Sequence, residues 1–225
     1  MGNRLSKIYT RTGDDGTTGM ADGSRISKAE LLFEVMGDID ELNSQLGLAR
    51  SYYQQALVTS SKPISSSKVT PLTDNADSEA ANFSAHMAQL NAPNFAHVLA
   101  ILQHLLFNLG GELAMPDYEG VSSAHTQWLE SQIDLMNEHL PPLKDFILPT
   151  GSILVSQLHV CRSVCRRGER HAVALNEQDQ TAIRPSATRF LNRLSDWLFV
   201  AARFCCAPDA RQEVLWDAKV LKSLL

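Results

Sequence analysis

The sequence predicts an all-α fold, a five-helix antiparallel bundle formed by one domain over residues 1–225. Three observations support this prediction. Apolar residues recur at steps of three and four along five separate segments, which is the period of a helix with one buried face. Strand signals are nearly absent, and no repeat of roughly 20 to 50 residues is evident. An antiparallel bundle buries five such apolar faces together.

The composition excludes several classes of protein. The chain has 225 residues, of which 44% are hydrophobic and 20% charged, and its net charge is −5. An acidic chain of this kind lacks the basic surface that would coat nucleic acid. No apolar run approaches the roughly 20 residues of a membrane helix, and the N-terminal segment has no apolar signal region. We therefore expect a cytoplasmic protein that binds neither nucleic acid nor membrane.

The first predicted helix covers residues 31–56, where apolar side chains follow the helical period. Residues 59–79 break this pattern, because six of the 21 are serine, two are proline, and the few apolar ones have no period. Such a stretch buries too little surface to offset the entropy of ordering it. We predict a mobile Ser-rich loop between the first two long helices. A linker between domains is the alternative, but residues 1–58 hold only one long helix and would not form a core.

Four more helices are predicted downstream. Proline ends the first two of them, because it cannot continue a helix interior. The third has apolar steps alternating between four and three, which is typical of a coiled-coil-like seam, and the last begins at a proline, which suits the first helical position. Their ranges are 95–115 before Pro116, 126–140 before Pro141, 151–176, and a last helix from Pro185 with an apolar face through Ala201. The four cysteines have no C-x-x-C spacing and are expected to be reduced core thiols.

The N-terminal segment 10–19 is too polar for the core, and it holds three glycines at steps of three among four hydroxyls. Glycine lets backbone N–H groups turn towards an anion, and Arg11 and Lys28 would add positive charge. The spacing matches neither a Walker A motif nor a dinucleotide fingerprint. A phosphate site is one interpretation, and an ordinary turn is the other. Asp14 and Asp15 fit a phosphate site only as turn formers or through a magnesium ion.

A row of arginines follows the fourth predicted helix. Arg162, Arg166 and Arg170 stand four residues apart, so their guanidinium groups share one face. Arg167 and Glu169 lie beside them. Because arginine binds phosphate through two parallel hydrogen bonds, the row is a candidate phosphate site. A solvated face with structural ion pairs is the alternative.

Two further clusters are polar. Asn192 and Asp196 lie on the last helix, where they form either a ligand-contacting face or an ion-pair network. Asp38, Asp40 and Glu41 on the first helix are candidate partners for arginines of another helix. They are also candidate metal ligands, but a di-iron bundle needs Glu-x-x-His pairs and the sequence has none. No order of Ser, His and Asp or of Cys and His suggests a catalytic nucleophile.

Five motifs, in this order along the chain, resemble the PduO-type ATP:cob(I)alamin adenosyltransferases, also called corrinoid adenosyltransferases. They cover nearly the whole chain except residues 55–95, and together they are specific, although each alone is weak. The motifs are Ile8 to Thr18, Asp40 to Ser44, Phe146 to Pro149 followed by Gly151, Leu158 to Arg170, and Leu191 to Asp196.

The resemblance implies a five-helix bundle that forms a homotrimer with ATP at its subunit interfaces. The implied reaction transfers the 5′-deoxyadenosyl group of ATP, bound with Mg²⁺, to the cobalt of reduced cob(I)alamin or a related corrinoid, giving adenosylcobalamin and triphosphate. A cobalamin reductase and an adenosylcobalamin-dependent acceptor enzyme are the implied protein partners. Because cobalt(I) is itself a strong nucleophile, this reaction needs positioning and charge stabilisation rather than a catalytic base.

The resemblance also assigns individual residues. Phe146 matches the aromatic residue that faces the corrin from below and helps keep the lower ligand off the cobalt. Asp40 and Arg162 match an intersubunit ion pair, and with Phe146 and Arg166 they form the expected catalytic set. No residue is assigned to a metal. The expected nucleotide-contacting residues are Thr10, Arg11, Thr12, Gly13, Thr18, Lys28, Arg166, Arg167, Gly168, Glu169, Arg170 and Asn192.

Two positions depart from the family pattern. Thr150 replaces a usual glycine, and Gly168 replaces a usual alanine, which should weaken its helix by about 1 kcal/mol.

Two other functions are alternatives. One is a corrinoid carrier without turnover, which would bind adenosylcobalamin but produce no triphosphate. The other is a structural bundle whose arginines pair with acids of the first helix, and it would show no ATP-dependent thermal shift.

Overall fold

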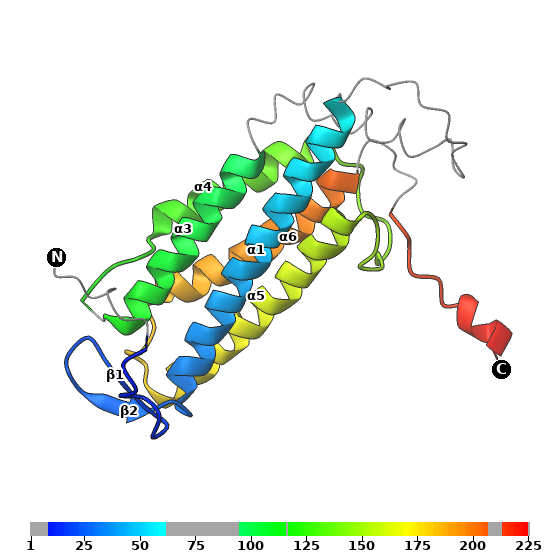
Figure 1. Ribbon diagram of the computed structural model, residues 1–225. Helices are drawn as coiled ribbons and strands as arrows, with labels where there is room; N and C mark the ends of the chain where they lie inside the picture. Colours follow the sequence, from blue (N-terminus) through cyan, green and yellow to red (C-terminus); the bar gives the residue numbers. More distant parts are fainter. Residues whose placement is uncertain (1–8, 62–94, 116, 207–212, 225) are drawn as a thin grey trace.

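A computed structural model gives the arrangement of the chain and describes residues 9–61, 95–115, 117–206 and 213–224. The predicted all-α bundle is confirmed: five long helices lie side by side in alternating directions (Figure 1). They are α1 (Leu31–Ser61), α3 (Phe95–Ala114), α4 (Ser123–Asn137), α5 (Ile153–Gln178) and α6 (Pro185–Cys206). Helix α1 continues to Ser61, so residues 59–61 of the predicted loop 59–79 are helical instead, and its residues 62–79 lie outside the described ranges.

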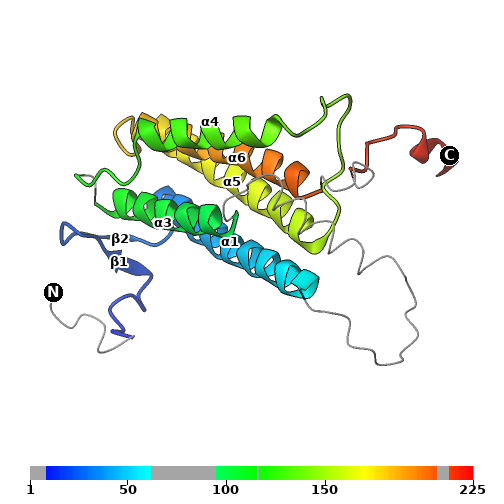
Figure 2. The same ribbon diagram turned by 90° about the horizontal axis from the view of Figure 1, so that it is seen from above.

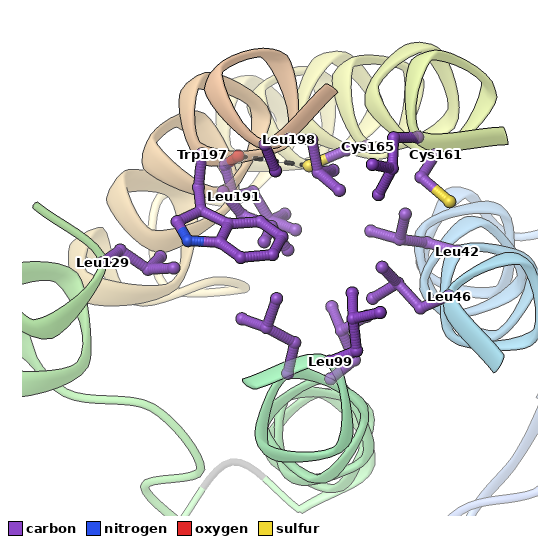
Figure 3. Packing of buried hydrophobic residues seen from close by; sticks show 14 of the residues in the cluster. Leu42, Leu46, Leu99, Leu129, Cys161, Cys165, Leu191, Trp197 and Leu198 are labelled. Atoms are coloured by element: carbon purple, nitrogen blue, oxygen red, sulfur yellow. Dashed lines mark hydrogen bonds between the residues drawn. The ribbon is translucent and has the colours of Figure 1, made fainter. Parts of the chain in front are cut away.

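The helices pack in pairs around one core. Helix α1 packs on α3 and α5, and α6 packs on α4 and α5, as the view from above shows (Figure 2). In Figure 3, side chains from all five helices point inward, with Leu46 and Leu99 among those that are fully buried. The indole ring of Trp197 stacks on Phe95 with 5.7 Å between ring centroids. The apolar stripes of the sequence are therefore the faces that form this core.

The four cysteines are free and buried, which confirms the expectation of core thiols. Burial raises the pKa of Cys161 to about 12. The Sγ atom of Cys165 donates a hydrogen bond to the carbonyl of Leu191, 3.2 Å away, and so links α5 to α6. No helix of the described residues is both long and apolar enough to cross a membrane.

A short hairpin precedes α1 and was not predicted. Strands β1 (Thr17–Gly19) and β2 (Arg25–Ser27) are antiparallel, with Thr18 opposite Ile26. Strands of three residues are too short to show the alternation by which strands are recognised. Gly23 has a φ of 88°, a left-handed conformation that glycine adopts without strain, in the turn between the strands. The hairpin lies at the end of the bundle where α1 begins and α5 ends (Figure 1).

A second irregular pairing forms at the other end of the bundle, where α5 begins. Residues 146–148 pair with residues 214–216, which follow α6. The backbone N–H of Leu148 donates to the carbonyl of Val214 at 2.7 Å, and that of Trp216 donates to the carbonyl of Phe146 at 2.8 Å. A 3₁₀-helix, Val220–Leu224, follows. The two ends of the bundle thus carry the two irregular segments in which site residues were predicted.

Candidate functional site

The N-terminal loop is closed by Lys28, which follows β2. Its Nζ atom donates to the carbonyl of Gly13 at 2.7 Å, and its backbone N–H donates to the carbonyl of Gly16 at 2.9 Å. A Cβ atom on Gly13 would lie 3.0 Å from this Nζ and 3.1 Å from the carbonyl oxygen of Thr17. Glycine at position 13 therefore permits the close approach that shapes the loop.

Arg25 of β2 and Asp15 of the loop itself also stabilise the loop by hydrogen bonds. The Arg25 guanidinium donates to the carbonyl of Thr12 and to the hydroxyl of Thr17. The Oδ1 atom of Asp15 accepts from the backbone N–H of Thr17 at 2.9 Å and from its hydroxyl at 2.8 Å. These hydrogen bonds lower the pKa of Asp15. Asp15 therefore acts as a turn former, one of the two roles in which the sequence analysis accepted it.

The outer rim of the loop is polar and exposed. The hydroxyls of Thr10 and Thr12 lie 2.9 Å apart, and both residues are exposed. Arg11 has a φ of 62°, a conformation that costs a non-glycine residue about 1–2 kcal/mol. Its guanidinium lies 5.6 Å from the centre of the Tyr9 ring. Residues with strained backbone cluster at ligand-binding sites, so this loop is a candidate binding loop.

On α5, Arg166 and Arg170 are exposed, and neither forms an ion pair within the described residues. One Nη atom of Arg170 donates to the carbonyl of Arg166 at 3.0 Å. Beside them, the side-chain amide of Asn192 on α6 donates to the Oε1 atom of Glu169 at 2.6 Å. The predicted row is therefore a real surface of unpaired positive charge, bordered by a polar contact between α5 and α6.

Arg167 behaves differently, because it turns towards α1. Its Nε atom donates to Asp38 Oδ1 at 2.7 Å, and it also contacts Glu41. The side chain of Asp38 is only 7% exposed, and its other oxygen lies 2.7 Å from Nδ1 of His171. The hydrogen bonds to Asp38 and Glu41 raise the pKa of Arg167. A purely structural basic face would pair every arginine with such acids, whereas among the described residues Arg167, which lies beside the row, is the one arginine of α5 that forms ion pairs.

Gly168 lies where α1 and α5 approach each other. A Cβ atom at this position would be 3.2 Å from the Cβ atom of Asp38, which is tighter than ordinary contact. The missing side chain therefore lets Asp38 reach Arg167 and His171. This packing offsets the helix propensity that the sequence analysis expected glycine to lose.

Asp40 and Arg162 do not meet within this chain. Asp40 is exposed on α1 and has no ion pair among the described residues. Arg162 is half-buried on α5, and its buried Nε atom has no hydrogen-bond partner there. Burial and the charge of Arg166 lower the pKa of Arg162. Two opposite charges are thus presented without partners on neighbouring helices.

His159 lies one turn before Arg162 on α5. It is 4% exposed, packs edge-on against Phe199, and its Nδ1 atom has no partner within the described residues. Burial first, and then the charge of Arg162, lowers its pKa to about 4. The neutral imidazole is therefore part of the core.

Phe146 lies at the opposite end of the bundle and is 78% exposed. Its backbone is held by residues 214–216, which the sequence analysis did not single out. The apolar run Val214–Leu215–Trp216 after a polar stretch was the available signal. Thr150 is exposed and donates its backbone N–H to the carbonyl of Leu148 at 2.8 Å. Its φ is not positive, so this position does not require glycine.

The predicted site residues therefore form separate groups. No hydrogen bond or ion pair among the described residues joins the loop 10–19 to α5. Helix α5 has 26 residues and so spans about 39 Å between the two ends of the bundle. Arg166 lies 13 residues after Ile153, about 20 Å along this helix. In the described part of the chain, no group of three or more His, Cys, Asp or Glu is arranged to hold a metal ion.

Comparison with known proteins matches the chain to one family along nearly its whole length. The family model for cobalamin adenosyltransferase matches residues 8–205. A cobalamin adenosyltransferase of Cupriavidus metallidurans is 40% identical over 218 residues, covering 96% of this chain and 97% of the relative. A corrinoid adenosyltransferase of Bacillus subtilis is 37% identical over 223 residues, covering 96% and 94%.

A solved structure agrees with these relatives. It shows a phenylalanine-to-histidine variant of a PduO-type ATP:corrinoid adenosyltransferase from Lactobacillus reuteri, complexed with cobalamin and ATP. Its TM-score is 0.71 at 30% sequence identity, and the match covers 94% of this chain and 97% of that one.

The burial of His159 predicts a loss of stability below neutral pH. His159 binds a proton near pH 6.5 in the unfolded chain and only near pH 4 in the folded protein. The contribution of the neutral His159 to the free energy of unfolding is therefore fully present above pH 6.5, and it is lost as the pH falls from 6.5 towards 4. Between pH 7 and 5 the loss from this site is at most about 2 kcal/mol.

Urea unfolding of the wild type and of His159→Phe at both pH values tests this. The variant should lose less stability than the wild type between pH 7 and 5. The matched control is His139→Phe, which changes an exposed histidine and should behave like the wild type. An equal loss in wild type and His159→Phe would contradict the assignment.

Proposed function

This chain belongs to the cobalamin adenosyltransferase family, and we propose that its N-terminal loop and the arginine row of a neighbouring subunit together form its ATP site. The protein is a corrinoid adenosyltransferase. It transfers the 5′-deoxyadenosyl group of ATP to the cobalt of a reduced corrinoid, giving adenosylcobalamin and triphosphate. Cobalt(I) supplies the electron pair of the new cobalt–carbon bond, and the C5′–O bond breaks as triphosphate leaves with its own pair.

The observation that carries this proposal is the separation of the two ends of the bundle. The loop 10–19 lies at one end and Phe146 at the other, about 39 Å apart along α5. The reaction requires C5′ of ATP next to cobalt, so one subunit cannot use both of its own ends. A loop from a neighbouring subunit, reaching the row near Arg166, would bring the nucleotide closer to Phe146.

The unpartnered charges support the same assembly. Asp40 and Arg162 lie on adjacent helices without an ion pair in the described part of the chain. Each needs an opposite charge if an interface buries it, because a buried unpaired charge is costly. We propose that Asp40 of one subunit pairs with Arg162 of the next, and that a homotrimer closes through three such contacts.

The protein's chemical contribution is electrostatic. Arg166 and Arg170 are unpaired and are well suited to bind the triphosphate as its negative charge develops. Lys28 and Gly13 shape the loop so that the exposed hydroxyls of its rim face the nucleotide. Because cobalt(I) is the nucleophile, no side chain has to remove a proton, and positioning of C5′ supplies the rest of the rate.

We propose that Mg²⁺ accompanies ATP. The carboxylate of Asp15 is engaged by Thr17, whereas that of Asp14 is exposed and has no partner within the described residues. Hard oxygen ligands suit Mg²⁺, which usually takes one or two carboxylates and phosphate oxygens. Asp14 therefore fits as the loop carboxylate that would reach such an ion. Bound there, Mg²⁺ would neutralise phosphate charge.

Phe146 is proposed to form the corrin-facing wall of the site. A phenylalanine that is 78% exposed contributes little to the core, so its apolar ring is available to a ligand. A corrin lying on this ring would meet a dry surface that leaves no room for a lower ligand on cobalt. A four-coordinate cobalt(II) is easier to reduce, so Phe146 would act before the transfer step.

Two partners and a location complete the proposal. Reduction of the cobalt calls for a cobalamin reductase, and the product calls for an adenosylcobalamin-dependent acceptor enzyme. The four free thiols support a reducing, cytoplasmic location.

Arg166→Ala tests the nucleotide site. It should weaken ATP binding by about 1.5–3 kcal/mol, because one charged hydrogen bond is lost, and turnover should fall with it. Calorimetric titration with ATP measures the affinity. Lys144→Ala, which removes one positive charge at the other end of the bundle, should leave the ATP affinity unchanged. Unchanged ATP affinity together with unchanged turnover in Arg166→Ala would refute the assignment.

Asp40→Ala tests the assembly. It should reduce activity and weaken the trimer, because an unpaired Arg162 left in a buried interface costs about 3–5 kcal/mol. Light scattering over a dilution series measures the subunit association. Asp134→Ala removes an exposed carboxylate of α4 and serves as the control. A wild-type protein that is monomeric at micromolar concentration would rule out the proposed interface.

Phe146→Ala tests the corrin-facing wall. The melting temperature and the ATP affinity should hardly change, because the ring is exposed and distant from the loop. Turnover should be lost with cobalt(II) cobalamin and a reductant, whereas pre-reduced cobalt(I) should restore much of the rate. Phe107→Ala is the matched control, since Phe107 is 77% exposed on α3. Equal losses with both cobalt states would argue against lower-ligand displacement. A large fall in the melting temperature would show that Phe146 stabilises the fold instead.

A further inference from the structure

Arg203 is a buried arginine near the end of α6. It contacts the chain that leads to Phe146 and also the chain that leads to residues 214–216, which pair with Phe146. We propose that Arg203 is a positioning residue for this segment and acts through Glu213. The inference rests on the corrin-facing role proposed for Phe146. It assigns to an ion pair, remote from the reacting atoms, the task of fixing where that aromatic ring is held.

The guanidinium of Arg203 binds two chain segments at once. It is 6% exposed, its Nε atom donates to Glu213 Oε1 at 2.7 Å, and one Nη atom donates to the carbonyl of Pro141 at 2.9 Å. Pro141 lies five residues before Phe146 on the incoming chain. The planar guanidinium presents donors in fixed directions, so arginine can hold two acceptors in a defined geometry.

Glu213 carries this hold into the backbone pairing of Phe146. It directly precedes Val214, whose carbonyl accepts from the backbone N–H of Leu148 at 2.7 Å. Two residues later, the backbone N–H of Trp216 donates to the carbonyl of Phe146 itself at 2.8 Å. The ion pair that holds Glu213 against Arg203 of α6 therefore sets the position of residues 214–216, which align residues 146–148.

The segment needs this support because little of it is buried. Residues 141–150 are all exposed except Ile147, which is half-buried. A two-stranded pairing alone is marginal in water. The ion pair, by contrast, lies in the protein interior: the side chains of Arg203 and Glu213 are 6% and 17% exposed. Hydrogen bonds anchored at this pair, rather than packing, hold Phe146 in place.

Glu213→Ala removes the carboxylate and changes no side chain of the five helices. Amide hydrogen exchange at Leu148 and Trp216 should become faster, because these N–H groups make the pairing. Turnover with cobalt(II) cobalamin and a reductant should fall roughly tenfold or more, the factor that one charge-assisted hydrogen bond is worth. The loss with cobalt(I) should be smaller, and ATP affinity should stay unchanged.

The matched control is Glu130→Ala. Glu130 also accepts from the Nε atom of an α6 arginine, Arg193, at 3.0 Å, but it lies on α4 and is 45% exposed. It should change neither the exchange at Leu148 nor the cobalt(II) rate. Arg203→Lys keeps the charge but cannot hold two acceptors in the same geometry, so it should fall between the wild type and Glu213→Ala.

A double-mutant cycle with Phe146→Ala separates the possible outcomes. If Glu213 acts through Phe146, then Glu213→Ala should cause no further loss of the cobalt(II) rate in the Phe146→Ala background. An equal further loss in that background, or unchanged exchange and turnover in the single variant, would overturn the inference.

The same cycle distinguishes failure of the inference from failure of the proposed role of Phe146. If Phe146→Ala alone leaves the cobalt(II) rate unchanged, the corrin-facing wall is wrong. Hydrogen exchange at Leu148 and Trp216 then still decides whether Arg203 and Glu213 position the segment. Faster exchange in Glu213→Ala would support the positioning role of Arg203 and Glu213, and unchanged exchange would refute it.

Discussion

The buried carboxylate of Asp38 determines how the basic face of α5 is used. It engages Arg167 and His171 from α1, and the absence of a side chain at Gly168 lets the two helices come close enough for this contact. Arg166, on the other hand, stays exposed and unpaired in the described part of the chain. Without Asp38, one more positive charge would crowd the row. The contact thus joins two helices and leaves Arg166 and Arg170 free to form the proposed phosphate-binding surface.

The length of the bundle imposes the second constraint. A helix of 26 residues separates the loop from Phe146 by about 39 Å, and a rigid bundle cannot shorten this distance. If the loop binds ATP and Phe146 faces the corrin, as we propose, the reaction has to join surfaces of different subunits. This constraint suits a reaction in which the metal is the nucleophile, because the protein has only to align two substrates and to stabilise the departing triphosphate.

Both ends of the bundle hold their exposed segments in the same way. At one end, Lys28 and Arg25 donate to backbone carbonyls of the loop 10–19. At the other, Arg203 donates to the carbonyl of Pro141 and to Glu213. Neither segment is buried enough for packing to position it. Basic side chains that donate to irregular backbone thus fix the segments that carry the proposed ligand-facing groups and leave these groups accessible.

The sequence by itself determined the five helices, the core thiols and the candidate arginine row, because each of these depends on a spacing along one helix. It also indicated the polar loop, since its glycines and hydroxyls are contiguous. Only the tertiary structure decided that Arg167 turns to Asp38, that His159 is buried and neutral, and that residues 214–216 pair with Phe146. These contacts join residues far apart in the chain, and no local period encodes them. The hairpin 17–27 was missed for a related reason, because three-residue strands are specified by their cross-strand partners.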